Sequence, residues 1–367
     1  MNFIWEISQS PYSSQFITSS MDFGTDKKCY LIDQYSGKQP FIINEEFLKK
    51  GQISFPIFPS VLLDSNISDE IVNFVNKGEC RDGVYELIKF MTKVNCDYSL
   101  LFYYLESLCK SENSELFLKY AKQSTECLLI LHSMDSNIFL ETNKIQSDPQ
   151  AVQHYLNTFQ CENLKEVAAK IVTDFLSKYS KSMINNQLIL IEIALIKILL
   201  IKKFEMKNGS HKDQINSFIS FFRNVLKINP AREMQFAIHY FHDTKDQLLN
   251  IQANTSFKKA LKLIKSTAWD LYLLRFPELF FKFKNNELNI FYIATQEHSL
   301  AELAKLFSIQ QIHIYNDQIY PIIAYDMSKI PESFTTPHMN KVDINRNFSL
   351  PNYLYESMIN ELKRLLK

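Results

Sequence analysis

The sequence contains very little glycine. Only 6 of its 367 residues are glycine, and none follows Gly209, whereas average usage of about 7% would give roughly 26. Loops that cradle phosphate groups need glycine where the backbone turns with positive φ or approaches the ligand closely. The scarcity of glycine therefore excludes Rossmann-type and P-loop nucleotide sites.

Closely spaced cysteine pairs are also absent. The six cysteines are scattered, no two form a Cys-x-x-Cys pair, and the N-terminal residues show no basic stretch leading into an apolar signal core. We therefore expect reduced thiols and a soluble, cytoplasmic protein.

A net positive charge and a membrane-length apolar run are missing as well. Lys and Arg number 40 against 40 Asp and Glu, so any site for a polyanion must be a local patch. The longest apolar run, Leu188–Ile201, is shorter than the roughly 20 residues needed to span a bilayer and contains Glu192 and Lys197. We expect a buried core helix and no membrane partner.

The distribution of turn signals and apolar residues predicts three regions. Residues 1–58 form a small β-containing N-terminal extension. Residues 59–316 form a helix-rich α/β domain that carries a large helical insertion over about 110–255. Residues 317–367 form an extended, proline-containing segment followed by an amphipathic helix.

The central region is predominantly helical in pattern. Between about 69 and 275, apolar residues recur at intervals of three and four, while glycine and proline are sparse. The predicted helices include 82–93, 114–131 and 185–206.

Apolar runs predict buried strands at 60–63, 289–295 and 311–315. The first strand ends on Asp64, and a helix over 298–307 lies between the second and third strands. A strand, a helix and a strand at this spacing form a βαβ unit, which implies a parallel sheet flanked by helices.

Acidic residues lie where ligands bind to such sheets, outside the carboxyl ends of the strands. Asp64 ends the first strand and Glu297 follows the second, while Asp270 lies on the helix leading into the second strand and Glu106 lies on an early helix. Oxygen-only ligands suit Mg²⁺ or Mn²⁺, and a bound cation lets like-charged acids sit together. All four acids are therefore candidate catalytic residues.

Two segments of the chain resemble the PIN-domain superfamily of metal-dependent nucleases. Asp64-Ser65-Asn66 matches the family's opening D-x-N, and Ile293–Leu300 is similar to its late A-T-x-D-x-x-L segment, with Glu297 where Asp is usual. The resemblance implies a PIN-like parallel sheet, bound Mg²⁺ or Mn²⁺, and hydrolysis of phosphodiester bonds, with RNA as the expected substrate. It further implies that Asp64, Asp270 and Glu297 bind the ion directly, and that Glu106 is a further ligand or an acid just beyond the direct ligands. By analogy it also implies a ribonuclease that acts as a toxin or an antiviral (phage-defence) effector, with Asn66 as a nucleic-acid contact.

A lysine stripe provides a local positive patch. Lys259, Lys262 and Ser266 precede Asp270 at spacings of three, four and four, which places all four on one helix face, and Lys265 adds charge to the same region. The stripe is a candidate phosphate-binding surface, and a solvated helix face is the equally weighted alternative.

The helical insertion over about 110–255 is longer than a minimal PIN core requires. An insertion beside a site is where a regulatory protein partner or an autoinhibitory contact would be expected. The alternative is that it simply enlarges the core.

Three other functions fit parts of the sequence. Arg232 and His239 have the spacing seen in HEPN ribonucleases, which cleave RNA without metal by 2′-OH attack. His242-Asp243 resembles the central dipeptide of HD-type metal phosphohydrolases, with His211 and Asp270 as partners. The third alternative is a non-catalytic helical interaction protein whose 29 Phe and 18 Tyr fill a core or a partner interface.

Overall fold

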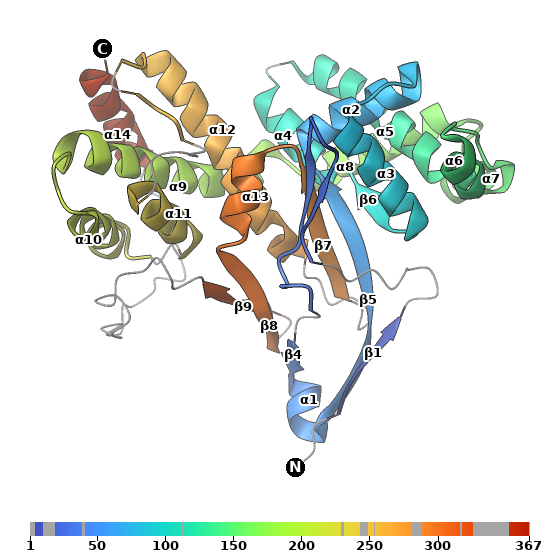
Figure 1. Cartoon of the computed structure of the whole chain (residues 1–367), viewed down its shortest axis with the longest axis horizontal. Helices are drawn as coiled ribbons and strands as arrows, with labels where there is room; N and C mark the ends of the chain where they lie inside the picture. Colours follow the sequence, from blue (N-terminus) through green and yellow to red (C-terminus); the bar gives the residue numbers. More distant parts are fainter. Residues whose placement is uncertain are drawn as a thin grey trace. The chain divides into compact units, whose positions relative to one another are not determined.

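The computed structural model (Figure 1) describes residues 4–9, 19–38, 41–111, 113–228, 231–242, 249–252, 254–280, 288–315, 318–325 and 352–366. It is a mixed α/β structure that is 65% helical, which confirms the helix-rich α/β class. The chain divides into two compact units. The first unit comprises Met1–Lys181, Arg275–Ala301 and Ser308–Ile323, and the second comprises Ser182–Leu274, Glu302–Phe307 and Ala324–Lys367.

The main sheet of the first unit has six strands in the order β1-β5-β7-β3-β2, with β6 also paired to β5. Strands β1 and β6 both run parallel to β5, which runs parallel to β7, whereas β3 is antiparallel to β7 and to β2. The strand bounds are β1 Ile4–Gln9, β2 Met21–Phe23, β3 Cys29–Ile32, β5 Gln52–Leu63, β6 Asp97–Ser99 and β7 Leu288–Thr295.

Strands β5 and β7 form the buried centre of this sheet and run side by side (Figure 1). Their C-terminal residues, including Leu62, Leu63 and Ile293, are fully buried, as expected for apolar runs in a parallel sheet covered on both faces. From β5 the chain continues to β6 on one side and returns much later to β7 on the other. The carboxyl ends of β5 and β7 therefore flank a topological switch point, where open α/β sheets bind ligands.

Helices pack against this sheet and against one another. Helix α2 contacts β7, α3 contacts β2 and β3, α4 contacts β5, and α5 packs on α2, α4 and α8. The bounds are α2 Ser65–Lys77, α3 Asp82–Lys93, α4 Leu101–Lys110, α5 Ser114–His132, α6 Ser136–Thr142, α7 Pro149–Phe159 and α8 Leu164–Lys178. The predicted helix over 82–93 coincides with α3, whereas α6 was not predicted.

The predicted βαβ unit is wrong. Strand β8 (Phe307–Tyr315) follows β7 and α13 (His298–Ala304), but it pairs in parallel with β4 (Phe41–Asn44) and continues to β9 (Gln318–Tyr325) in a separate sheet. Both edges of β7 are already hydrogen-bonded, one to β5 and the other to β3. A strand with two occupied edges cannot accept a further neighbour.

The region boundaries in the structure differ from those expected from sequence. The expected extension, residues 1–58, supplies β1 to β4, helix α1 (Glu45–Lys50) and most of β5, so it is part of the two sheets. The expected insertion, about 110–255, is divided between the units, with α5 to α8 in the first unit. Helix α14 (Asn352–Leu365), from the expected third region, belongs to the second unit.

The β2–β3 hairpin is fastened to the start of α3. The Asp82 carboxylate accepts hydrogen bonds from the backbone amides of Thr25 (2.8 Å) and Lys27 (3.2 Å), and these amides hold its pKa at about 2. A Cβ on Gly83 would lie 2.5 Å from the Cys29 backbone nitrogen. Only glycine permits this approach of helix to hairpin, which places β3 beside β7.

The second unit is helical. It contains α9 (Lys181–Leu200), the π-helical turn Ile201–Glu205, α10 (His211–Phe221), α11 (Ala231–His242), α12 (Phe257–Arg275) and α14. Among the described residues, Ile184–Glu205 is long and apolar enough to cross a membrane, but 67% of its most apolar window is buried inside the protein. This burial is consistent with the core helix of a soluble protein. The segment extends beyond both ends of the apolar run Leu188–Ile201 that the sequence showed.

Candidate functional site

Asp64 lies at the switch point, immediately after β5. Its backbone amide donates to the Ala294 carbonyl at 3.0 Å, which continues the pairing of β5 with β7. Its side chain caps α2, because Oδ1 accepts from the Ser65 amide at 2.7 Å. Oδ2 accepts from the Thr295 hydroxyl at 2.7 Å and from the Asn66 side-chain amide at 2.9 Å. The carboxylate is thus held by both strand ends and by the start of α2.

The electrostatics of this position disfavour the ionised carboxylate. Burial raises the pKa of Asp64 from 3.8 to about 6, against the lowering effect of the Thr295 hydroxyl. The charges of Glu106 and Glu297 raise it further, and the Ser65 amide lowers it. Glu106 and Glu297, two of the three other acids expected at the site, are therefore close enough to Asp64 to act on its titration. A buried acid with a raised pKa in such a position is a functional-site candidate.

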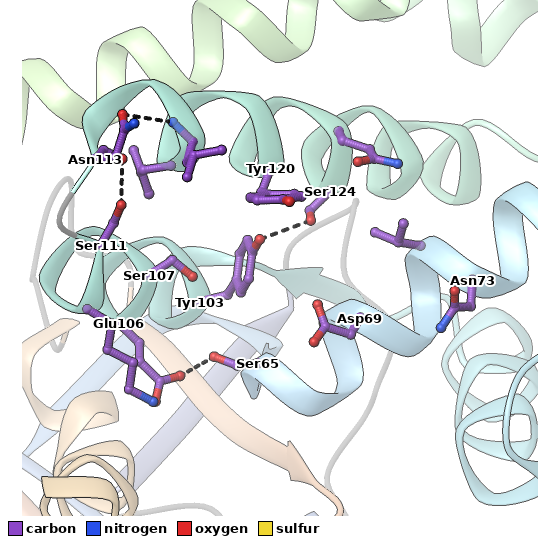
Figure 2. Close-up of a pocket in the computed structure, with 15 residues that line it drawn as sticks. Ser65, Asp69, Asn73, Tyr103, Glu106, Ser107, Ser111, Asn113, Tyr120 and Ser124 are labelled. Carbon is purple, nitrogen blue, oxygen red and sulfur yellow. Dashed lines mark hydrogen bonds and ion pairs between the residues drawn. The ribbon is translucent and has the colours of Figure 1, made fainter. Parts of the chain in front are cut away.

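Glu106 is joined to Asp64 through Ser65. It lies on α4 and is only 6% exposed. One carboxylate oxygen accepts a hydrogen bond from the Ser65 hydroxyl, and the other pairs with the Lys110 ammonium one helical turn away. Figure 2 shows the Ser65–Glu106 contact between α2 and α4. Glu106 therefore lies beside the end of β5, and its catalytic role stays a prediction.

Glu297 and Asn66 complete the rim of the strand ends. Glu297 is exposed, and its backbone amide donates to the Thr295 hydroxyl at 3.1 Å. The Asn66 amide group donates to Asp64 and accepts from the Gln296 backbone amide at 3.3 Å. Asn66 therefore positions the turn after β7, and its predicted role in binding nucleic acid stays a prediction.

Comparisons of the chain with protein-family models, with curated proteins and with solved structures found no match. The PIN-domain resemblance thus rests on the two short sequence segments.

Three residues at the site carried no role in the sequence prediction: Ser65, Lys110 and Thr295. Ser65 and Thr295 both lie inside the PIN-like segments, so their positions were visible. Their contacts were not, because each reaches a residue far away in the chain. Lys110 follows Glu106 by four residues on a helix, a spacing at which ion pairs form. That signal was present in the sequence.

Asp270 and the lysine stripe belong to the second unit. Asp270 lies on α12, and its convergence with Asp64 stays a prediction. Lys259, Lys262 and Lys265 are all exposed on this helix, so the predicted lysine face exists. Lys265 also lowers the pKa of Glu192, which is raised chiefly by burial.

The donor set suits a hard divalent cation. Among the described residues, no three His, Cys, Asp or Glu side chains are gathered as a group that could hold one ion, and the convergence of Asp64, Asp270 and Glu297 stays a prediction. Mg²⁺, however, is usually bound by one or two carboxylates together with several waters and a substrate phosphate. Asp64 and Glu106 fit this pattern, because a carboxylate has about four acceptor positions and the described contacts leave part of each free.

The HEPN alternative depends on Arg232 and His239, both on α11. Arg232 is 5% exposed, and its guanidinium lies 4.9 Å from the centroid of the Phe307 ring. A guanidinium enclosed in this way packs as a core side chain. Its position disfavours direct contact with an RNA backbone.

Two of the residues expected for the HD-type alternative lie together in the second unit. His211 at the start of α10 and His242 at the end of α11 face each other, with Nδ1 atoms 3.2 Å apart. Asp243, the other half of the dipeptide, lies outside the described residues.

Proposed function

We propose that the first unit hydrolyses phosphodiester bonds of RNA with the help of bound Mg²⁺ or Mn²⁺, on a PIN-like core. The observation that carries the proposal is the link from Thr295 through Asp64 and Ser65 to Glu106 at the switch point. Two acids held together at the carboxyl ends of parallel strands match the kind of site that binds Mg²⁺ and phosphate.

The residues have separate roles in this proposal. Asp64 supplies the first ligand oxygen, and Thr295 and Asn66 fix its orientation. Glu106 supplies the second, positioned by Ser65. When bound, the divalent ion lowers the pKa of a coordinated water and stabilises the leaving oxygen. Glu297 is exposed beside Asp64 and is available to orient that water.

The remaining expected residues, Asp270 and the three lysines, lie on the second unit. Asp270 is proposed as a further acid, and Lys259, Lys262 and Lys265 as phosphate contacts on its exposed helix face. Ser182–Asn229 includes α9, whose side chains from Ile193 to Ile196 are fully buried. This burial favours a core role for that part of the expected insertion, so a regulatory protein partner would bind elsewhere on the unit.

Cleavage assays test the proposal directly. Wild type, Asp64→Asn, Asp270→Asn and His239→Ala would be incubated with single-stranded RNA, structured RNA and DNA, in Mg²⁺, in Mn²⁺ and in chelator. Loss of a metal-binding carboxylate removes ion binding and water activation together, so Asp64→Asn should reduce cleavage by several orders of magnitude. His239→Ala should cleave as wild type does.

Two outcomes would contradict the proposal. Cleavage that survives chelator and Asp64→Asn but requires His239 would establish the metal-free HEPN mechanism. Absence of cleavage under every condition, in protein that is folded by circular dichroism, would favour the non-catalytic interaction protein. Loss of cleavage in Asp64→Asn but not in Asp270→Asn would restrict the site to the first unit.

A second candidate is a metal phosphohydrolase site of HD type in the second unit. It is favoured by the 3.2 Å separation of the His211 and His242 Nδ1 atoms, because two nitrogens bound tetrahedrally to one Zn²⁺ at about 2.0–2.1 Å lie about 3.3 Å apart. Titration with Zn²⁺ or Mn²⁺ should then raise the Tm of wild type but not of His211→Ala. An equal rise in both would remove this candidate.

A further inference from the structure

A cavity of about 1010 Å³ opens between α2, α4 and α5 in the first unit. Figure 2 shows that Ser65 and Glu106 lie at one end of it, and that Tyr103, Tyr120 and Ser124 lie toward α5. The cavity therefore begins at the residues that connect to Asp64. Its volume is at the upper end of the roughly 300–1,000 Å³ typical of ligand sites.

Among the aromatic residues that line the cavity, Tyr120 is exposed, whereas Tyr103 and Phe117 are buried. Tyr103 is a fixed wall, because its hydroxyl accepts a hydrogen bond from the Ser124 hydroxyl at 3.3 Å and its side chain is buried. Tyr120 is 53% exposed although it lines the cavity. An exposed tyrosine ring beside a cavity is a surface on which a planar group can stack, and every nucleobase has such a face.

Polar groups that match base edges also line the cavity. Asn73 on α2 and Gln123 on α5 contribute side-chain amides, and Asp69 contributes a carboxylate that points into the cavity (Figure 2). Partial burial, Glu70 and Glu106 raise the pKa of Asp69. Amides both donate and accept hydrogen bonds, and a carboxylate accepts from exocyclic amino groups, as unpaired bases require.

The positive charges lie at the rim. Lys110 borders the cavity, Lys119 places its ammonium 5.9 Å from the centroid of the Tyr120 ring, and Lys181 donates to the Ser111 carbonyl at 2.6 Å. Asp69 and Glu106 lie inside and repel phosphate. The charge pattern thus admits bases to the interior and keeps a phosphate backbone at the edge.

We propose that this cavity binds unpaired bases of a single-stranded nucleic acid, with Tyr120 as the stacking surface and the strand running toward Asp64 and Glu106. The inference rests on the proposed function, because it makes the cavity the substrate channel of that site. Paired bases do not expose their faces, so duplexes are excluded. Single-stranded RNA and DNA share the chemistry that the cavity recognises, and binding measurements distinguish them.

The test measures binding apart from cleavage. Full-length protein carrying Asp64→Asn would be titrated in chelator against short fluorescein-labelled oligoadenylates of RNA and of DNA, and against an RNA duplex, by fluorescence anisotropy. Adding Tyr120→Ala should raise the Kd for single strands roughly ten-fold or more, whereas Tyr120→Phe keeps the ring and should retain the parent Kd. Tyr353→Ala, at another exposed tyrosine on α14, should bind as the parent does.

A second variant keeps the test independent of one substitution. Gln123→Ala removes an exposed side-chain amide, which would bind a base by hydrogen bonds and not by stacking. This variant should also weaken binding, while its Tm stays that of the parent. Equal affinity of Tyr120→Ala, Gln123→Ala and the parent would overturn the inference, as would stronger binding of duplex than of single strands.

The cleavage and binding measurements distinguish failure of the inference from failure of the proposed function. Metal-dependent cleavage that needs Asp64 but is indifferent to Tyr120→Ala would retain the nuclease and reject the channel. Binding that depends on Tyr120, in a protein that cleaves nothing with any ion, would retain the channel and reject the nuclease.

Discussion

The Thr295 hydroxyl donates a 2.7 Å hydrogen bond to Oδ2 of Asp64, which lies 231 residues earlier in the chain. The bond joins the ends of β7 and β5, whose backbones also meet through the Asp64 amide and the Ala294 carbonyl. Thr295 is fully buried and Asp64 is 8% exposed. The bond therefore acts in a medium of low polarity, where it has a large effect on the titration of the carboxylate.

Asp64→Asn should increase stability at neutral pH in the absence of divalent ions. The folded-state pKa of about 6 exceeds the ordinary value of 3.8, so the stability that Asp64 contributes when protonated is lost as pH rises through 6. The rise corresponds to about 3 kcal/mol. Urea unfolding should show a gain of about 1–3 kcal/mol for the variant at pH 7.5, shrinking toward pH 4. A variant less stable at both pH values would contradict this.

Thr295→Val should move the pH dependence of cleavage upward. The Thr295 hydroxyl lowers the pKa of Asp64, so its removal raises that pKa, and a higher pH is needed to ionise the carboxylate. The midpoint of the acidic limb of the pH–rate profile should therefore rise. Thr295→Ser keeps the hydroxyl and should retain the wild-type midpoint. An equal shift in both variants would show that loss of the hydroxyl is not its cause.

The affinity for Mg²⁺ should rise between pH 5 and pH 7.5. The ion binds the ionised carboxylate, so below the Asp64 pKa of about 6 a proton must leave on binding. The affinity for Mg²⁺ should then fall about ten-fold for each pH unit below 6. Isothermal titration calorimetry measures this dependence, and Asp64→Asn should abolish it. Affinity that is independent of pH in wild type would place the ion elsewhere.

Lys110→Met should strengthen binding of Mg²⁺. Lys110 is 54% exposed and pairs with the Glu106 carboxylate, which is 8% exposed, so the ion competes with the ammonium for this oxygen. Exposed ion pairs contribute only about 0.2–1 kcal/mol, and the Kd for Mg²⁺ should fall about two- to five-fold. Lys119→Met serves as the matched control because Lys119 has no described contact with Glu106. Weaker binding in Lys110→Met would mean that Lys110 orients Glu106.

Gly83→Ala should destabilise the first unit. The added Cβ would lie 2.5 Å from the Cys29 backbone nitrogen and 2.6 Å from the Lys27 carbonyl oxygen, and backbone atoms cannot move aside as a flexible side chain can. Overpacking of this kind costs about 1–3 kcal/mol. Thermal unfolding should show a clear fall in Tm, whereas Gly209→Ala, with its nearest contacts at 3.2 Å, should show a small one. Equal effects would refute the close-approach explanation.

Because Tyr30 of β3 pairs with Thr295, Gly83→Ala should also weaken cleavage. Gly83 supports the β2–β3 hairpin, and β3 pairs with β7 on the edge opposite to β5.

Local pattern was enough to predict the helices around the site and the two strands that end there. The helix over 82–93, the helix beginning at 114 and the strand ends at Asp64 and Thr295 all follow from the spacing of apolar residues within a few turns of chain. The same pattern located Asp64 as the acid that follows a buried strand, and Glu106 as an acid on the apolar helix after that strand.

Only the tertiary structure decided which strand edges meet and which polar groups contact Asp64. Strand β8 pairs with β4 because β7 has no free edge, and residues 1–58 join the sheets through β1 and β3. Such choices depend on the packing of the whole sheet, which no local pattern encodes. The Thr295 and Ser65 contacts arise in the same way. Hydrogen bonds between residues 231 and 41 positions apart exist only after the strands and helices that carry them have packed together.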